Sequence, residues 1–123
     1  MITAVAVGAA AALGAIARYL LDQTVTRRLR TVFPLGTWLI NITGSFVLGL
    51  IAGTAAHHGL SPRVVAIVGT GVCGGYTTFS TFSHDTIRLM EDGSGLTALG
   101  NAVGSIASGL AAAALGLGLA LVL

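Results

Sequence analysis

Four long apolar stretches, each almost free of charged residues, occupy nearly the whole of this 123-residue chain. They cover about residues 2–21, 35–56, 62–90 and 96–123. A helix needs roughly 20 apolar residues to cross the hydrocarbon core of a bilayer, so each stretch is long enough to span it. Only 8% of the residues are charged and 54% are hydrophobic, which leaves too few charges to coat a water-facing surface. The sequence therefore predicts an all-α membrane protein of four transmembrane helices, folded as one domain over residues 1–123.

The composition argues against several classes of function. Six arginines and four carboxylates give a formal net charge of +2, which is too small for a nucleic-acid-binding patch. Cys73 is the only cysteine, which excludes an intrachain disulfide and a Cys-x-x-Cys metal site. Because no histidine lies near Cys73 in the sequence, this residue reads as a small buried hydrophobe rather than a nucleophile. We therefore expect that the protein is not an enzyme.

The arginines are distributed unevenly among the loops. An even number of spans places both termini on one side of the membrane, and the middle loop on that same side contains only Arg63. The loops after the first and third spans contain Arg27, Arg28, Arg30 and Arg88. By the positive-inside rule, this bias favours cytoplasmic first and third loops, with both termini outside.

The third apolar stretch is a poor candidate for a continuous helix. Its segment from Gly69 to Ser83 contains four glycines and six serine or threonine residues. In hydrocarbon, a broken helix survives only where the freed carbonyls and N–H groups face protein, water or an ion. We expect a break near Gly74-Gly75, buried at a protein interface.

Small residues recur at the four-residue spacing of close helix contacts. The pairs are Gly49 with Gly53, Gly71 with Gly75, and Gly100 with Gly104. Packing within the chain would explain most of the glycines. However, four thin helices can hardly enclose a pore alone, so the sequence favours a dimer.

Polar but uncharged side chains line two of the predicted spans. Thr37, Asn41 and Ser45 share one helix face in the second span, and Asn101, Ser105 and Ser108 do much the same in the fourth. An unpaired amide in hydrocarbon is costly, so Asn41 either links two helices or lines a polar pathway.

The same spans lack intramembrane carboxylates, because the four acidic residues all lie near span ends: Asp22, Asp85, Glu91 and Asp92. This absence argues against a proton-coupled exporter of organic cations, which generally needs such a group.

Several groups in the spans suit an anion. Amides and hydroxyls donate hydrogen bonds, and the rings of Phe79 and Phe82 have positive edges that an anion can meet in the ring plane. Arg18 lies one turn inside the first span, where it could attract an anion. Alternatively, Arg18 pairs with Asp22, four residues along the same helix, as a structural ion pair.

Four stretches, in order along the chain, closely resemble the Fluc/CrcB family of fluoride channels. The longest is the third-span signature of that family, Gly71 to Ser83. The others are Gly14–Leu20, Pro34–Thr37 and Asn41–Phe46. The resemblance implies a passive, fluoride-specific channel in the cytoplasmic (inner) membrane that exports fluoride and protects the cell from its toxicity. It also implies an antiparallel dimer with two pores, so that the expected partners are fluoride, a second subunit and the lipid bilayer.

Site residues follow from the resemblance by position. Gly74 and Thr77 would give main-chain carbonyls to a structural sodium ion at the dimer centre, which is not transported. Asn41 would donate to fluoride, and Arg18 would be a vestibule or structural charge. The remaining pathway residues would be Phe79, Phe82, Thr78, Ser80, Thr81 and Ser105.

Two features depart from the family pattern. The fourth span has Asn101, Ser105 and Gly109 where relatives often place an aromatic residue or an asparagine. In addition, single-gene members have nearly balanced loops, whereas this chain has an arginine bias. The bias suggests a heterodimer with a paired, oppositely oriented homologue as an alternative to the homodimer. A membrane scaffold without transport activity is a further alternative.

Overall fold

The computed structural model describes all 123 residues and contains helices only. Each of the four predicted spans is helical and is long and apolar enough to cross a membrane. The first span is α1 (Ile2–Arg28), the second is α2 (Leu35–His58) and the fourth is α6 (Gly95–Val122). The third consists of α3 (Pro62–Val64), the π-helical segment η1 (Val65–Cys73), α4 (Gly74–Tyr76) and α5 (Phe79–Glu91). The predicted all-α fold with a broken third helix is confirmed.

The first helix is longer than the predicted membrane span, because it continues past Leu21 to Arg28. Polar side chains support this extension from within the helix itself. Arg27 Nη2 donates to Gln23 Oε1 (3.1 Å), and the Thr24 hydroxyl donates to the Leu20 carbonyl (2.7 Å). The last turns of α1 are therefore a polar helical end, in which basic residues complement the helix dipole.

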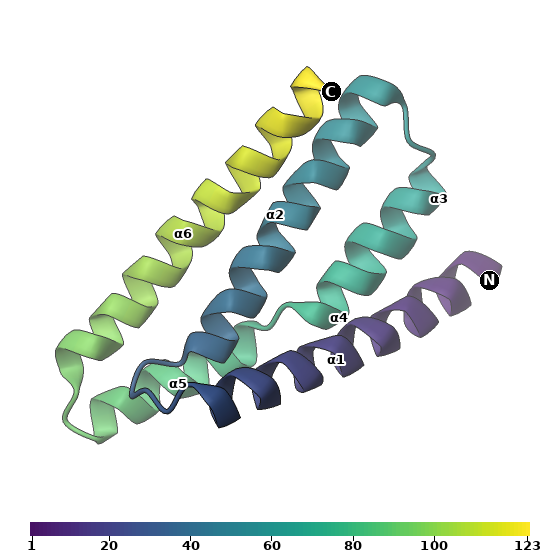
Figure 1. Ribbon diagram of the computed structural model, residues 1–123. Helices are drawn as coiled ribbons and strands as arrows, with labels where there is room; N and C mark the ends of the chain where they lie inside the picture. The colour runs from purple at the N-terminus through teal and green to yellow at the C-terminus, as the bar shows by residue number, and fades with distance from the viewer.

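The helices form two pairs (Figure 1). In one pair α2 packs along α6, and in the other α1 packs along η1 and α4. Both termini lie at the same end of the molecule, as an even number of spans requires, and the α1–α2 and α5–α6 connections lie at the opposite end. Contacts of α2 with α1 and with η1 join the two pairs.

Glycines allow the backbones within each pair to approach closely. A Cβ on Gly49 would collide with the backbone of Ala113 in α6, and one on Gly75 would collide with the backbone of Ala11 in α1. The predicted close contacts at two of the three glycine pairs therefore occur within the chain. The third pair differs, because nothing lies within 4 Å of the Cβ positions of Gly100 and Gly104. At these two positions α6 faces away from the rest of the chain.

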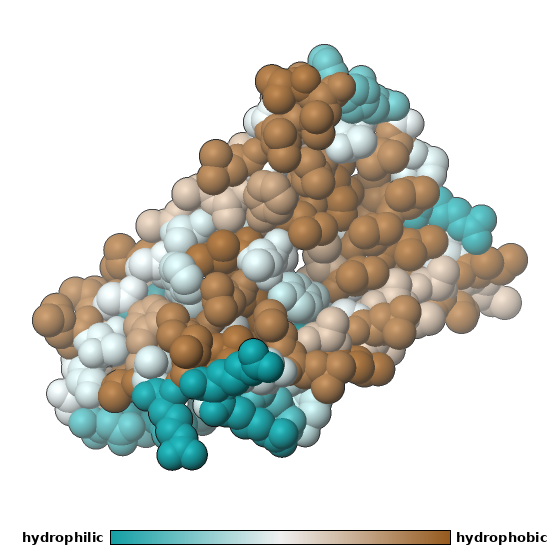
Figure 2. Space-filling view, in the orientation of Figure 1, coloured by the Kyte–Doolittle hydropathy of each residue, from teal (hydrophilic) through white to brown (hydrophobic).

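The surface is mostly apolar, as a lipid-facing protein requires. Only 18 of the 123 residues are buried, so most large hydrophobic side chains point outward rather than into a core. Figure 2 shows strongly hydrophilic residues at the ends of the molecule and hydrophobic or weakly polar residues between them. Lipid, rather than water, is the medium that matches the outward-facing side chains.

The close contact at Gly49 predicts that Gly49→Ala destabilises the protein. The added methyl would meet the Ala113 backbone and push α2 and α6 apart, at a typical overpacking cost of about 1–3 kcal/mol. The matched control is Gly118→Ala in α6, where the new methyl meets nothing within 4 Å. Thermal unfolding in detergent should show a lower midpoint for Gly49→Ala alone, and equal midpoints for the two variants would contradict the packing described here.

Candidate functional site

The third span is interrupted at Thr77 and Thr78, whose backbones are extended, with ψ angles of 161° and 125°. The predicted break near Gly74-Gly75 therefore lies a few residues further along. Both glycines stay in helical conformation, while two successive β-branched threonines favour the extended one. The Thr78 hydroxyl then caps α5 by accepting the Thr81 N–H (3.1 Å), so the helix restarts at once.

Asn41 of α2 holds the extended segment through two hydrogen bonds. Its Nδ2 donates to the Thr78 carbonyl (2.9 Å), and its Oδ1 accepts the Thr78 N–H (2.8 Å). The amide thus gives Thr78 the pair of bonds that a neighbouring β-strand would give. We call this pair of bonds the Asn41–Thr78 clamp. The clamp fixes the orientation of the amide and leaves the second Nδ2 hydrogen free to donate elsewhere.

The break releases two carbonyls that were predicted to bind a cation. In an uninterrupted α-helix the Gly74 carbonyl would accept the Thr78 N–H, which is instead donated to Asn41. The Thr77 carbonyl would accept the Thr81 N–H, which is instead donated to the Thr78 hydroxyl. Gly74 is exposed, and nothing lies within 4 Å of its Cβ position, so its backbone is accessible from outside the chain.

A groove of about 540 Å³ lies beside the break, between α2, the third span and α6. Its lining contains seven of the site residues that the resemblance implies, which are Asn41, Gly74, Thr77, Thr78, Phe79, Phe82 and Ser105. The lining also contains Ser45 but no acidic residue. Its polar groups are therefore hydroxyls, an amide and backbone, and the hydroxyl and amide groups can donate to an anion.

Phe79 and Phe82 form an aromatic pair on the wall of this groove. Their ring centroids are 5.7 Å apart and the ring planes are inclined at 42°. Phe79 is 79% exposed and Phe82 is half-buried. The positive edges of the two rings add to the donors of the groove.

Ser105 of α6 belongs to a short series of hydrogen bonds that also includes Asn101 and Thr86. Asn101 is fully buried (0% exposed) and its Nδ2 donates to the Thr86 hydroxyl (2.8 Å). The Ser105 hydroxyl donates to Asn101 Oδ1 (3.3 Å). Ser108, by contrast, bonds only to carbonyls of its own helix. Asn101 therefore links α6 to α5, whereas Ser105 is the α6 side chain from this set that reaches the groove.

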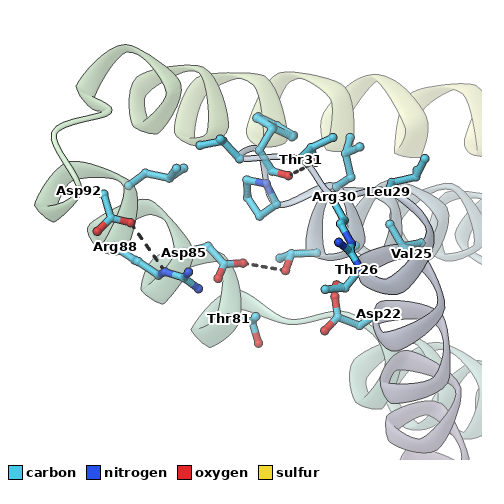
Figure 3. A pocket seen from close by; sticks show the side chains of 17 residues that line it. Asp22, Val25, Thr26, Leu29, Arg30, Thr31, Thr81, Asp85, Arg88 and Asp92 are labelled. Atoms are coloured by element: carbon cyan, nitrogen blue, oxygen red, sulfur yellow. Dashed lines mark hydrogen bonds and ion pairs between the residues drawn. The ribbon is translucent and has the colours of Figure 1, made fainter.

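A second hollow, of about 690 Å³, lies at the end of the molecule that contains the α1–α2 loop (Figure 3). Acidic and basic side chains from α1, the loop and α5 face it, among them Asp22, Arg30, Asp85 and Arg88. The buried Thr37 hydroxyl (4% exposed for the residue) donates to Asp85 Oδ2 (2.8 Å). We call this hollow the charged vestibule.

Two hydroxyls connect the groove with the charged vestibule. Thr78 lines the groove and Thr81 lines the vestibule, and the Thr78 hydroxyl donates to the Thr81 hydroxyl (3.0 Å). Ser80 lines neither hollow, although its hydroxyl lies 3.3 Å from that of Thr78. The N-cap residue of α5 is thus the polar link between the two hollows.

Arg18 does not form the ion pair with Asp22 that its spacing suggested. Its Nη1 instead donates to the Thr77 carbonyl at the break (3.3 Å). The carboxylates within 4.0 Å of a basic side chain are those of Asp85, beside His84, and Asp92, beside Arg88. Because a released carbonyl is an unpaired acceptor at membrane depth, it outcompetes a carboxylate at the more polar helix end.

The pairing of Thr37 with Asp85 was not predicted from the sequence. Asp85 lies near the end of a span, yet the carboxylate is largely enclosed, with its side chain 19% exposed, and accepts a hydrogen bond from α2. The available signal was the polar stripe of α2, in which Thr37 precedes Asn41 by four residues. The stripe needs partners on a facing helix at both positions, and Thr78 and Asp85 supply them.

The chain is similar to proteins of one family. Residues 5–117 match the family described as CrcB-like protein, Camphor Resistance (CrcB). A Frankia casuarinae protein named fluoride-specific ion channel FluC 1 is 51% identical over 91% of both chains. A Natronomonas pharaonis protein named fluoride-specific ion channel FluC 2 is 45% identical, over 97% of this chain and 95% of its own. A Mycobacterium tuberculosis protein, also named FluC 2, is 47% identical, over 85% and 79% respectively. All three are named as ion channels, not as enzymes.

The clamp predicts a large effect of Asn41→Ala on stability. The substitution removes both partners of the Thr78 backbone groups, and each polar group left unpaired costs about 1–3 kcal/mol. Thr54→Ala is the matched control in α2, because the Thr54 hydroxyl bonds only to the Leu50 carbonyl of its own helix. Unfolding in detergent should occur at clearly lower temperature for Asn41→Ala, with Thr54→Ala close to the unsubstituted protein. An Asn41→Ala protein as stable as this control would show that Asn41 does not hold the break.

Proposed function

The chain belongs to the CrcB family, and on that premise we propose that it is a subunit of a fluoride-specific ion channel. The channel provides a passive route by which fluoride leaves the cell across the cytoplasmic membrane, which lowers the internal concentration of a toxic ion. The observation that carries this proposal is the identity of about half the residues with proteins named fluoride-specific ion channels, over nearly the whole of both chains.

The chemistry of the groove supports an anion as the permeating species. Fluoride holds its water strongly, so a pathway must replace that water with closely spaced donors. The free Nδ2 hydrogen of Asn41 and the edges of Phe79 and Phe82 are such groups. The Ser105 hydroxyl joins them only when it exchanges its 3.3 Å bond to Asn101 for the ion. Since no carboxylate lines the groove, nothing in it would hold a cationic drug or carry a coupled proton.

The charged vestibule supplies an approach to this pathway. The carboxylates of Asp22, Asp85 and Asp92 face it together with Arg30 and Arg88. Because Arg88 pairs with Asp92, Arg30 is the guanidinium that an approaching anion can meet, and Thr81 stands between the vestibule and the groove. We propose that fluoride passes between the two hollows along the hydroxyls of Thr78 and Thr81, with Ser80 beside them.

A second subunit is part of the proposal, because the groove is open along one side of a single chain. The exposed ring of Phe79 and the uncovered backbone at Gly74 both face that side, and polar backbone does not face lipid. An antiparallel dimer would cover this surface and create two equivalent pathways, one lined by each groove.

The partner is either a second copy of the chain or a paired homologue of opposite orientation. The arginine bias towards one end of the molecule favours a fixed orientation, and relatives carry both the FluC 1 and FluC 2 names. Reconstitution of this chain alone distinguishes the two arrangements. Fluoride-conducting dimers obtained from it without any other subunit would exclude an obligatory heterodimer.

We further propose that a sodium ion holds the two breaks together at the centre of the dimer. The residues fit such a group, because the break frees the carbonyls of Gly74 and Thr77 from their helical partners. Oxygen ligands of this kind suit a hard cation. When bound, the ion would supply positive charge to carbonyls of both subunits, and it would be structural rather than transported.

Substitutions in the groove test the proposed pathway. Asn41→Asp keeps the acceptor for the Thr78 N–H but replaces the donor with a negative charge, and Phe82→Ile removes a ring edge. Each should reduce fluoride efflux from proteoliposomes by about tenfold or more, equivalent to a barrier higher by about 1.4 kcal/mol.

Phe46→Ile is the control, because Phe46 lies on α2 and lines neither hollow. A fluoride electrode records efflux, and size-exclusion chromatography establishes that each variant remains dimeric. If Asn41→Asp and Phe82→Ile released fluoride at the rate of Phe46→Ile, the groove would not be the pathway.

A further inference from the structure

Arg18 is a positive charge at membrane depth with one hydrogen-bond partner. Its guanidinium is half-buried, and its bond is to the Thr77 carbonyl, at 3.3 Å. No carboxylate lies within 4.0 Å of it, since the ion pairs of the chain are His84 with Asp85 and Arg88 with Asp92. The charge of Arg18 is therefore directed at the broken segment rather than balanced by an acidic side chain.

The Thr77 carbonyl is available to Arg18 because of the break. The Thr81 N–H, which would have bonded it in a continuous helix, is donated to the Thr78 hydroxyl. In the isolated subunit the guanidinium thus satisfies a backbone acceptor that would otherwise be unpaired. The Gly74 carbonyl, freed by the same break, accepts no side-chain hydrogen bond in the structure.

We propose that Arg18 and a sodium ion compete for the Thr77 carbonyl, an inference that rests on the sodium site of the proposed function. A carbonyl oxygen has two lone pairs and could accept from both. However, two cations on one oxygen would lie within a few ångströms of each other where water is scarce, and like charges there repel strongly. Arg18 holds the break in the sodium-free protein, and sodium binding weakens its bond to Thr77.

This competition makes Arg18 a positioning residue with two opposite effects. Without sodium it stabilises the segment, because it supplies the missing partner of the Thr77 carbonyl. With sodium it lowers the affinity for the ion, because its charge lies beside one of the proposed ligands. If the role of Arg18 were purely structural, its substitution would lower stability with and without sodium and would leave the sodium affinity unchanged.

The test is a sodium titration of the purified protein in detergent. Sodium chloride replaces the chloride salt of a bulky organic cation at constant ionic strength, and the thermal unfolding midpoint is recorded at each concentration. Arg18→Gln removes the charge but keeps a donor, and Arg18→Lys keeps the charge. Arg27→Gln is the matched control, because Arg27 bonds to Gln23 at the exposed end of the same helix.

We expect Arg18→Gln to unfold at a lower temperature than the unsubstituted protein when sodium is absent. Its half-effective sodium concentration should fall by about tenfold, which corresponds to about 1.4 kcal/mol of sodium binding. Arg18→Lys and Arg27→Gln should keep the sodium dependence of the unsubstituted protein.

Three results would overturn the competition. The first is a half-effective sodium concentration for Arg18→Gln that equals or exceeds that of the unsubstituted protein. The second is an Arg18→Gln protein that remains unfolded at saturating sodium. The third is an unsubstituted protein whose unfolding midpoint does not depend on sodium, which would also rule out the proposed sodium site. In that third case, fluoride efflux from proteoliposomes of the unsubstituted protein distinguishes failure of the sodium site from failure of the proposed function. If the protein conducts fluoride, only the sodium site is wrong.

Discussion

A backbone polar group at membrane depth must find a partner, and the third span of this protein is organised by that requirement. Two threonines leave the helix, so the N–H and carbonyl groups around them lose their usual bonds. Asn41 restores two bonds from α2, Thr78 caps the helix that follows, and Arg18 reaches the Thr77 carbonyl from α1. Three helices thus meet at one interruption, which explains why polar side chains occur in spans that are otherwise apolar.

The character of the groove follows from how these partners are used. Because both ends of the Asn41 amide bond to Thr78, the amide is fixed with one N–H left over, directed away from the clamp. The same threonine connects the groove to the charged vestibule through the Thr78 and Thr81 hydroxyls. The interruption that costs the helix several bonds therefore also supplies a donor, an aromatic wall and a polar connection. In the channel proposed here, an anion exchanges its water for these groups.

The amino-acid sequence was sufficient to predict the four spans and the broken third helix, and it singled out about half of the 16 residues that line the groove. Length, hydropathy and the run of glycines and hydroxyl residues between Gly69 and Ser83 are local signals, and they were read correctly. The position of the break was less accessible, because glycine tolerates a helix as well as a turn and the two threonines decided the outcome. The expected contact at Gly100 and Gly104 is absent from the chain for a similar reason, since spacing does not indicate which face of α6 meets a neighbour.

Partners that are distant in the sequence were the hardest to predict. Arg18 and Thr77 are separated by 59 positions, and Thr37 and Asp85 by 48. The four-residue spacing on one helix suggested Asp22 as the partner of Arg18, whereas the structure pairs Arg18 with the Thr77 carbonyl of the third span. Such a pairing depends on how the helices pack, and a local stretch of sequence does not specify that packing.

Fluoride release from liposomes that contain the purified dimer tests the central claim most directly. With an electrode in the external solution and a potassium gradient clamped by valinomycin, protein-containing vesicles should empty of fluoride much faster than protein-free vesicles. A protein that purifies only as a monomer, or a dimer that releases fluoride no faster than bare lipid, would contradict the view that the clamped break lines an anion pathway.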